Sequence, residues 1–475
     1  MNGAVLVTGG TGVVGRALVS GLVATGRRVI LLSRGMQPIR VANGAEHLHG
    51  DVAKPALGLD QTAYTRLAEK ITSIYHLAAR TDFKSSDVEE YVSINIDGCH
   101  NVLALAHRAG AHLHHVSTAF VCGTHAGRFG EHQLECGQEF RNGYEQSKFL
   151  AERELRRLAD QNGVPLTVYR PSIILERRPD GASPIGFGPF VFLDAVFRLL
   201  LSPAYRQHGS GTIRIAGSSI SQLPFIFDDD VARALLAISA SDACKGQTYH
   251  LVAKQPFANT ALEDIFNRAF GRKVACWVDQ REFDSRSPDK GERIIARKTA
   301  MYSPYLNLTV QFSRTNLDLA MGEDFCRSVT PDEVFRAFHF FLQAKKNSDD
   351  VVVHSTEQQT AVREYFTSFL PVIMGKNLID NLVSLSCNFW ITVEQLGHYS
   401  LVINSGKLTD INTNRRGTFG YLIGAETFLQ VVSGEMTPQQ GFFNGSIEIE
   451  GKMLEALQTA AALEEFFRLK PFIVR

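Results

Sequence analysis

Val7-Thr8-Gly9-Gly10-Thr11-Gly12-Val13-Val14-Gly15 is the stretch that decides the fold of the first part of this 475-residue chain. It overlaps Ala4–Thr8, a short apolar run that ends in glycines and predicts a buried parallel strand. After it, apolar residues recur at helical spacing and predict a helix over Arg16–Thr25, with Gly26 as its C-cap. The order strand, glycine-rich turn, helix is therefore predicted here.

Strand and helix continue to alternate as far as residue 170. The predicted segments are strand Arg28–Leu32, strand Ile71–Leu77, helix Tyr91–Ala109, strand Leu113–Val116, helix Tyr144–Gln161 and strand Leu166–Arg170. Such alternation indicates an α/β fold with a Rossmann-type, doubly wound parallel sheet.

The regularity fades after Pro171. Glycine and proline cluster at Gly181–Pro189, and residues 171 to about 342 predict a smaller substrate-binding lobe. Within it, Asp228–Ile238 predicts a helix that returns to the main sheet, with the pair Asp229–Asp230 as its cap.

A second domain is predicted after the polar stretch Ala344–Asp350, which is typical of a linker. We place the boundary between residues 1–347 and 348–475. The predicted elements of the second domain form an α+β module: helix Gln358–Ser384, strands around Phe389–Val393, Ser400–Ile403, Thr418–Ile423 and Ser446–Glu450, and helix Met453–Leu469.

Composition is that of an ordinary globular protein, with 44% hydrophobic and 21% charged residues and no formal net charge. A neutral balance gives no support to nucleic-acid binding. Seven cysteines without CxxC spacing predict reduced thiols, and neither a signal peptide nor a membrane-spanning run is recognisable. We expect a cytoplasmic protein with at most peripheral membrane contact.

The glycine turn predicts a dinucleotide site. In Gly9-x-x-Gly12-x-x-Gly15 the glycines permit a tight turn, and the backbone amides of the turn and of Thr11, Val13 and Val14 face a pyrophosphate from the helix N-terminus. Gly10-x-Gly12-x-x-Gly15 fits the older spacing equally well, so the motif leaves the subfamily open.

The end of the second strand favours NADP over NAD. The sequence there is Leu32-Ser33-Arg34, without the acid that would hold the ribose 2′-hydroxyl of NAD. Arg34 can pair with a 2′-phosphate through its guanidinium fork. The alternative is an arginine that is merely solvated at a strand end.

Three residues predict the chemistry. Tyr144 and Lys148, at positions i and i+4, share a helix face, where the ammonium would lower the pKa of the phenol. Thr118, at the end of a strand, would hydrogen-bond the substrate carbonyl oxygen, while strand alternation turns Ser117 away. A Tyr-x-x-x-Lys pair alone is usually a surface pair, but together with the glycine turn it predicts a reductase site.

These motifs make residues 1 to about 342 similar to the extended short-chain dehydrogenase/reductases, and most to the thioester reductase and fatty acyl-CoA reductase branch. The resemblance implies that Asp51 and Val52 contact the adenine, that Leu77, Ala78 and Ala79 line the cofactor, and that Pro171 and Ser172 face the nicotinamide. Leu77 departs from a commoner asparagine, and no carrier-protein or adenylation domain precedes the reductase. The matching segments are Gly50-Asp51-Val52, Leu57-Gly58-Leu59, Ile74–Ala79, His115–Phe120 and Tyr169–Ser172.

No metal site is predicted. His112, His114 and His115 are crowded, but no acidic or cysteine partner is spaced for a metal, so we interpret them as strand and loop histidines.

Residues 350–475 resemble the sterol carrier protein type of lipid-binding domain. The resemblance rests on Phe389-Trp390-Ile391, Gly434–Pro438 and Phe442–Gly451, and implies helices that cover a twisted sheet and enclose an apolar tunnel. The alternative is a dimerisation or stability module whose apolar residues are simply core.

The leading hypothesis is an NADP-dependent reductase of a lipophilic carbonyl or acyl thioester, of fatty acyl or polyketide type, which yields an aldehyde or an alcohol. The C-terminal domain would hold the apolar substrate, and a carrier protein is one way to present a thioester. A sterol or hydroxy-ketone dehydrogenase is the nearest rival, and the fold alone also admits a nucleotide-sugar epimerase. A lipid-transfer protein that senses NADP is the alternative from another class.

Overall fold

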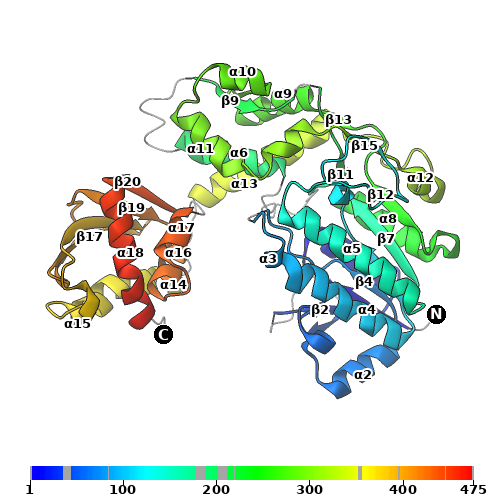
Figure 1. The fold of residues 1–475 in the computed structure, drawn as a ribbon, viewed down its shortest axis with the longest axis horizontal. Helices are drawn as coiled ribbons and strands as arrows, with labels where there is room; N and C mark the ends of the chain where they lie inside the picture. The colour runs from blue at the N-terminus through cyan, green and yellow to red at the C-terminus, as the bar shows by residue number, and fades with distance from the viewer. Residues whose placement is uncertain are drawn as a thin grey trace. The chain divides into compact units, whose positions relative to one another are not determined.

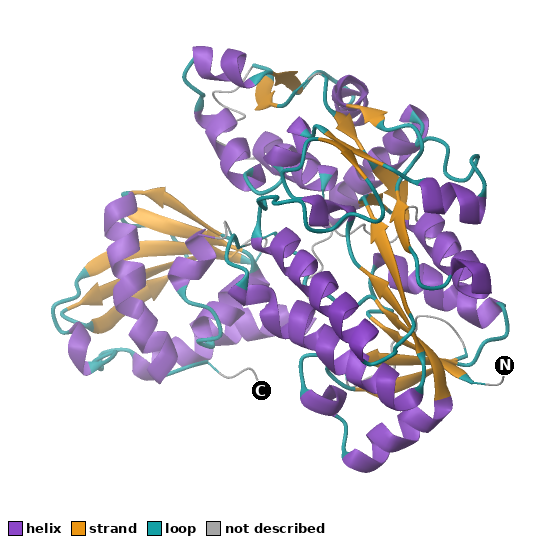
Figure 2. Cartoon of the chain, turned by 45° about the vertical axis from the view of Figure 1, so that its right-hand side comes forward, coloured by secondary structure: helices purple, strands orange, loops and turns teal. Residues whose placement is uncertain are grey.

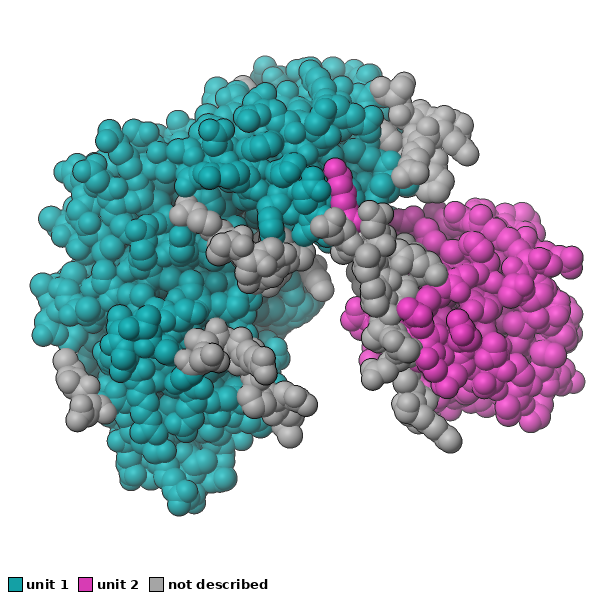
Figure 3. All heavy atoms as spheres, turned by 180° about the vertical axis from the view of Figure 1, so that it is seen from behind, with its two compact units in different colours: residues 1–345 teal, residues 346–475 magenta. Residues whose placement is uncertain are grey.

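The structure is a computed structural model that describes residues 3–35, 44–83, 85–176, 188–201, 211–218, 220–350, 356–393, 396–443 and 446–472. Most of the predicted cluster Gly181–Pro189 lies outside the described residues. The chain forms two compact units, residues 1–345 and 346–475 (Figure 3). In the described part of the chain, no helix is both long enough and apolar enough to cross a bilayer.

The first unit is built on a seven-stranded parallel sheet of order β12-β7-β5-β4-β1-β2-β3. The order reverses between β1 and β4, which makes the carboxyl ends of these two strands the switch point of the sheet. The Rossmann-type prediction is confirmed, although β3 and β12 were not predicted. The strands are β1 (Ala4–Thr8), β2 (Val29–Ser33), β3 (Ala45–His49), β4 (Ile71–His76), β5 (His112–Val116), β7 (Leu166–Pro171) and β12 (Thr248–Leu251).

Helices cover both faces of this sheet (Figures 1 and 2). Alternate residues of each strand face opposite layers, so that Val5 and Val7 pack with α1 and α8, whereas Ala4 and Leu6 pack with α2, α4 and α5. The helices are α1 (Val13–Ala24), α2 (Gln61–Lys70), α4 (Asp97–Ala109), α5 (Gly143–Gln161), α8 (Asp228–Ala240) and α12 (Thr315–Met321).

The predicted helix Tyr91–Ala109 is broken into three pieces: α3 (Glu89–Tyr91), the π-helical turn η2 (Val92–Ile96) and α4. The side chain of Asn95 bonds to both backbone groups of Arg80 and donates to Ser147 Oγ at 2.8 Å. The wide turn thus places Asn95 inward, where it ties the loop after β4 to α5.

The predicted cap of α8 is wrong in detail. Phe227 occupies the N-cap position, and Asp229 and Asp230 lie within the first turn, where their charge still favours the helix N-terminus. Asp230 is ion-paired with Arg233 one turn later.

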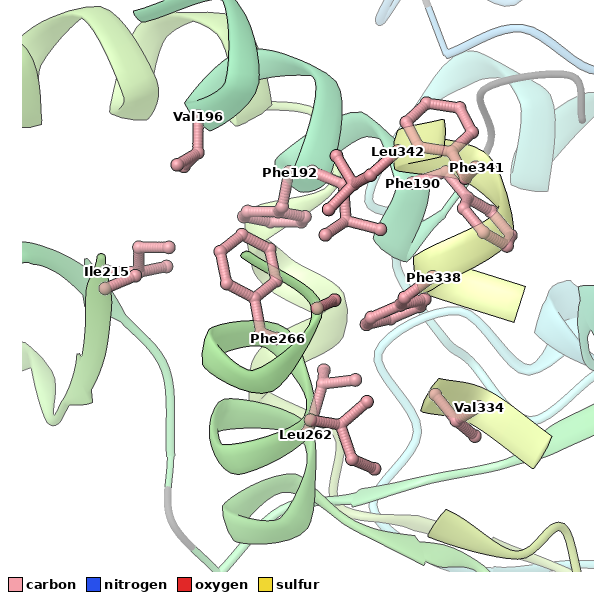
Figure 4. Packing of buried hydrophobic residues seen from close by; sticks show 14 of the residues in the cluster. Phe190, Phe192, Val196, Ile215, Leu262, Phe266, Val334, Phe338, Phe341 and Leu342 are labelled. Atoms are coloured by element: carbon pink, nitrogen blue, oxygen red, sulfur yellow. The ribbon is translucent and has the colours of Figure 1, made fainter. Parts of the chain in front are cut away.

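The lobe has a hydrophobic core of its own (Figure 4). It gathers Phe190 and Phe192 from α6, Phe266 from α9, and Phe338 and Phe341 from α13. The main elements are α6 (Pro189–Leu201), β9 (Ile213–Ala216), α9 (Asn259–Phe270), β14 (Ala275–Val278), α11 (Lys290–Thr299) and α13 (Pro331–Asp350).

The first unit also contains shorter elements. They are η1 (Pro55–Gly58), η3 (Ala119–Cys122), β6 (Gly127–Phe129), β8 (Ile173–Leu175), β10 (Gln222–Leu223), β11 (Phe225–Phe227), η4 (Asp242–Cys244), β13 (Phe257–Ala258), α10 (Gln280–Ser285), η5 (Ser303–Asn307) and β15 (Val310–Phe312).

The stretch Ala344–Asp350 contains the division between the two units, as predicted for a linker, but it is helical. It contains neither glycine nor proline, so nothing in it stops α13, which Phe341 and Leu342 anchor in the lobe core. The division between the two units falls within this helix, after Lys345.

The second unit contains a five-stranded sheet of order β18-β17-β16-β19-β20. Only β16 and β19 pair in parallel. The predicted strands and the last helix are present, and β18 was missed. The elements are β16 (Cys387–Val393), β17 (Gly397–Asn404), β18 (Lys407–Asn412), β19 (Phe419–Ile423), β20 (Ile447–Gly451), α14 (Thr356–Glu364), η6 (Tyr365–Phe369), α15 (Leu370–Ile373), η7 (Asp380–Leu382), α16 (Ala425–Val432), α17 (Pro438–Phe443) and α18 (Met453–Leu469).

The predicted helix Gln358–Ser384 is too long. Helical structure stops at Ile373, and Gly375 follows with a φ of 74°, which favours glycine. The chain then pairs with the β17–β18 hairpin, because Gly375 N–H donates to Leu408 and Leu378 N–H donates to Gly406.

Candidate active site

The glycine turn is shaped by close backbone contacts. Gly9 has a φ of 72°, and a Cβ on it would lie 2.5 Å from the backbone nitrogen of Ala78. A Cβ on Gly15 would lie 2.2 Å from the carbonyl oxygen of Gly9. Both positions therefore require glycine, and together they pack the turn against α1 and the loop after β4.

The N-terminus of α1 is open to a ligand. Gly12 is its N-cap and supplies no side chain to the free amides of the first turn. A Cβ on Gly12 would meet only the oxygen of Gly9, at 3.3 Å, so that the remaining space is available for a phosphate group. The turn thus fits a dinucleotide.

One cavity of about 490 Å³ lies at the carboxyl ends of the central strands. The structure brings together in its wall every residue that the sequence predicted for the site. These are Gly9, Thr11, Gly12, Val13, Val14, Gly15, Arg34, Asp51, Val52, Leu77, Ala78, Ala79, Thr118, Tyr144, Lys148, Pro171 and Ser172.

The residues predicted to hold the adenosine half of the cofactor line the cavity. Arg34 is exposed directly after β2 and lines the cavity. Asp51 accepts the amide of Ala53 at 3.0 Å, and Asn101 holds the carbonyl oxygen of Val52 at 2.8 Å. These bonds fix the turn after β3.

Thr118 and Tyr144 meet at the other end. Thr118 precedes η3, and its Oγ1 accepts the amide of Phe120 at 3.3 Å. Burial raises the pKa of Tyr144 to about 12, and a hydrogen bond with Thr118 opposes this rise. The phenol is therefore protonated at neutral pH.

The ammonium of Lys148 is held by a backbone carbonyl group. Its Nζ donates to the carbonyl oxygen of Val116 at 2.8 Å, so the ammonium is directed at the end of β5. Burial lowers the pKa of Lys148. The effect of its ammonium on the phenol of Tyr144 stays a prediction.

Aromatic residues around Tyr144 were missed by the sequence analysis. The ring of Phe83 lies 5.3 Å from that of Tyr144 and 4.9 Å from that of Tyr302. Tyr305 donates to Glu145 Oε1 at 2.6 Å and bonds to Asn142, the N-cap of α5, at 2.9 Å. These contacts attach the lobe to the start of the helix that carries Tyr144.

A buried ion pair fixes the other side of α5. Arg170 Nη2 lies 2.7 Å from Glu152 Oε1, and both side chains are fully buried. Burial alone would raise the pKa of Glu152, but Arg170 and Arg156 hold it well below its ordinary value. The pair joins α5 to the end of β7, directly before Pro171 and Ser172.

A second ion pair, also missed, braces the glycine turn. Arg16 on α1 bonds to the carbonyl oxygen of Thr11 at 2.9 Å and to Glu176 Oε1 at 2.7 Å. Because Glu176 follows β8, this pair connects the turn to the segment after Ser172. Only the tertiary structure reveals it, since 160 residues separate its members.

The histidine interpretation needs one correction. His112 and His114 stack on each other, but His115 does have a cysteine partner, since its Nδ1 lies 4.0 Å from Cys99 Sγ. His76, Cys99 and His115 form a buried group whose potential ligand atoms lie within 4.8 Å of one another. Burial, helped by the nearby Lys148 ammonium, lowers the pKa of His76 to about 3. Because the Lys148 ammonium disfavours a second positive charge nearby, we interpret His76, Cys99 and His115 as uncharged residues of the core.

Comparisons with known proteins cover the first unit. Residues 40–213 match the model of a family described as "Male sterility protein". The hybrid PKS-NRPS synthetase pvhA of Talaromyces variabilis is 33% identical over 174 residues, which are 36% of this chain and 4% of that protein. The 2-alkyl-3-oxoalkanoate reductase of Stenotrophomonas maltophilia is 26% identical over 284 residues, which are 58% of this chain and 77% of that protein.

Among solved structures, the terminal R domain of the myxalamid PKS-NRPS pathway is similar with a TM-score of 0.59 and 23% identity. The match covers 74% of this chain and 92% of that domain. It shows the Rossmann-type fold of this unit.

Proposed function

We propose that residues 1–345 form an NADPH-dependent reductase of a lipophilic carbonyl or acyl thioester. The observation that carries this proposal is one cavity that joins the glycine turn, the pair Thr118–Tyr144 and an apolar lobe. Similarity to an R domain and to a named reductase supports the same reaction class.

The residues divide the work along the cavity. The glycine turn and the N-terminus of α1 would bind the pyrophosphate, Arg34 the 2′-phosphate, and Lys148 the nicotinamide ribose. Bound NADPH would supply the hydride. Thr118 and the protonated Tyr144 would both bond to the carbonyl oxygen, where negative charge develops, and Tyr144 would donate the proton.

The lobe end of the cavity supports an apolar substrate. In the described residues it is lined mainly by Phe, Leu, Trp and Tyr side chains, and the charged Glu176 beside it is paired with Arg16. Among these described lining residues, no lysine or arginine of the lobe is present to pair with the diphosphate of a nucleotide sugar, which argues against an epimerase. A thioester would release its thiol and leave an aldehyde, and a second reduction would give an alcohol.

A ketone reductase is the second candidate. It is favoured by the match to 2-alkyl-3-oxoalkanoate reductase, which covers most of that protein. The thioester hypothesis expects release of a free thiol, whereas the ketone hypothesis does not.

For residues 346–475 we propose binding of the apolar part of the substrate. This unit contains a cavity of about 80 Å³. Since an engineered cavity of about 150 Å³ is what admits benzene, a longer chain requires the covering helices to move apart. Its lining residues are Tyr365, Leu370, Leu378, Phe389, Ile391, Leu401, Ile403, Leu408, Tyr421, Ile423, Phe428, Val431, Val432, Pro438, Ile447, Ala460, Leu463, Phe466 and Phe467.

One screen tests the assignment. NADPH oxidation is measured with long-chain acyl-CoA, fatty aldehydes and sterol ketones, with products identified by mass and free thiol followed in parallel. We expect acyl-CoA or aldehyde to be reduced. Reduction of ketones alone would select the second candidate, and no reduction of any class would refute the reductase function.

A further inference from the structure

The lobe end of the cavity is lined by aromatic side chains that contact one another in sequence. The series begins close to Ser172. A Cβ on Gly188 would lie 3.3 Å from the side chain of Ile173, the residue after Ser172, and Phe190 follows Gly188 at the start of α6. The ring of Phe190 lies 5.6 Å from that of Phe338, which lies 6.5 Å from that of Phe266. These contacts lead away from the reacting end.

Trp277 completes the series. Its ring lies 5.3 Å from that of Phe266, and a Cβ on Gly217 would lie 2.9 Å from Trp277 and 3.2 Å from Leu306. Leu306 adjoins Tyr305, whose ring faces Phe83 at 5.5 Å and so leads back to Tyr144. The cavity therefore has a reacting end and, across it, an aromatic end formed by Phe266, Trp277 and Phe338.

This aromatic end is backed by close packing. Phe266 and Phe338 are 1% and 0% exposed, and their rings meet at 90° (Figure 4). Val334 and Phe341 of the same helix as Phe338 are also fully buried. Because packed cores resist displacement, these rings cannot yield to a ligand without loss of core contacts.

We propose that Phe266, Trp277 and Phe338 limit the length of the alkyl chain that the lobe accepts. This inference rests on the proposed function, since the chain would belong to the substrate whose carbonyl lies at Tyr144. Each methylene buried before the limit should raise kcat/KM about fourfold, and a chain that reaches the rings should gain nothing more.

A kinetic comparison within α13 tests the proposal. Phe338→Leu and Phe341→Leu remove the same atoms from the same helix and core, but only Phe338 lines the cavity. We expect Phe338→Leu to move the optimum of kcat/KM toward longer chains, and Phe341→Leu to leave the optimum in place. An equal shift in both variants, or no shift in Phe338→Leu, would overturn the proposal.

A binding measurement separates this inference from the proposed function. The chain has two tryptophans, so the full-length Trp390→Phe variant leaves Trp277 as its single indole reporter. Straight-chain 1-alkanols of increasing length are titrated, with calorimetry to detect binding. We expect Trp277 emission to change only above a threshold length, which should rise in Phe338→Leu.

Emission that responds equally to all lengths, or to none, would refute the limit. A threshold in an enzyme that oxidises no NADPH with any acyl substrate would refute the proposed function and leave the limit intact.

Discussion

The two units of this chain each contain a cavity, and the two cavities differ in what lines them. The first, of about 490 Å³, joins Thr118, Tyr144 and Lys148 to an apolar lobe. The second, of about 80 Å³, is lined almost wholly by apolar side chains, and the hydroxyl of its Tyr421 is already bonded to Ala456 at 2.6 Å. A cavity with so few polar groups can hold an apolar ligand but offers little to stabilise developing charge. The proposal therefore gives reaction to the first unit and retention of the apolar substrate to the second.

The largest expected effect is confined to the first cavity. Tyr144→Phe should reduce kcat by about 10²–10⁴-fold, because the ring and its contact with Phe83 stay while the proton donor is lost. NADPH binding and binding of apolar ligands by residues 346–475 should be unchanged. Lys148→Ala should impair both turnover and NADPH binding. A near-parental rate in Tyr144→Phe would mean that another group donates the proton.

A second prediction separates the stabilities of the units. Arg170→Leu should destabilise the first unit by about 3–5 kcal/mol, because the buried Glu152 carboxylate loses the guanidinium of Arg170, its nearest ion-pair partner. Unfolding in denaturant is followed by Trp277 in a Trp390→Phe background and by Trp390 in a Trp277→Phe background. Only the first signal should shift.

Arg28→Leu is the matched control, since its pair with Glu46 is 58% and 50% exposed. It should cost no more than about 1 kcal/mol. Equal losses in the two arginine variants would contradict the importance of the buried pair.

The same pair predicts a pH dependence. Because the folded pKa of Glu152 is depressed below its ordinary value of 4.5, its contribution is full above that pH and is lost as the pH falls further. The stability difference between the parent and Glu152→Gln should therefore be constant near neutral pH and shrink below about pH 4.5. A difference that grows on acidification would contradict the depressed pKa.

A smaller effect concerns cofactor choice. NADPH should bind about tenfold or more tightly than NADH, because Arg34 stands where an acid would select NAD. Arg34→Ala should remove most of this preference, with NADH affinity unchanged as the internal control. Equal affinities for both cofactors in the parent would refute the assignment.

Local patterns made much of the first unit predictable. The glycine turn and the spacing of Tyr144 and Lys148 lie within single elements, and the structure gathers all of these residues in one cavity. What the sequence hid depends on distant partners. The π-helical turn at Asn95 needs Arg80 and Ser147, and the direction of Lys148 is set by the carbonyl oxygen of Val116.

In the second unit, the sequence analysis predicted a helix that is too long, because it was extended to Ser384. The segment after Gly375 instead pairs with a hairpin that includes β18, a strand that the sequence did not reveal. The sequence located the division between the units at Ala344–Asp350 but did not reveal that this stretch is helical, because a polar stretch without glycine or proline remains a good helix. The aromatic end of the lobe was missed for the same physical reason as the ion pairs, since Phe338 comes from α13, much later in the chain than Phe266 on α9 and Trp277 on β14.

The smallest expected effect tests whether the second cavity serves the first. Ala460 on α18 lines the second cavity, whereas its neighbour Ala461 is exposed on the same helix. Ala460→Leu should fill the cavity and weaken binding of apolar ligands, because each methylene they bury contributes about 0.8 kcal/mol. Reduction of short, water-soluble carbonyls should be unchanged, but KM for long-chain substrates should rise, because a tethered site no longer raises their local concentration. Ala461→Leu should leave both kinetics and ligand binding as in the parent. If Ala460→Leu has no effect on long-chain KM while it abolishes ligand binding, the two cavities are independent. If it affects neither, residues 346–475 are better interpreted as a folding or oligomerisation module.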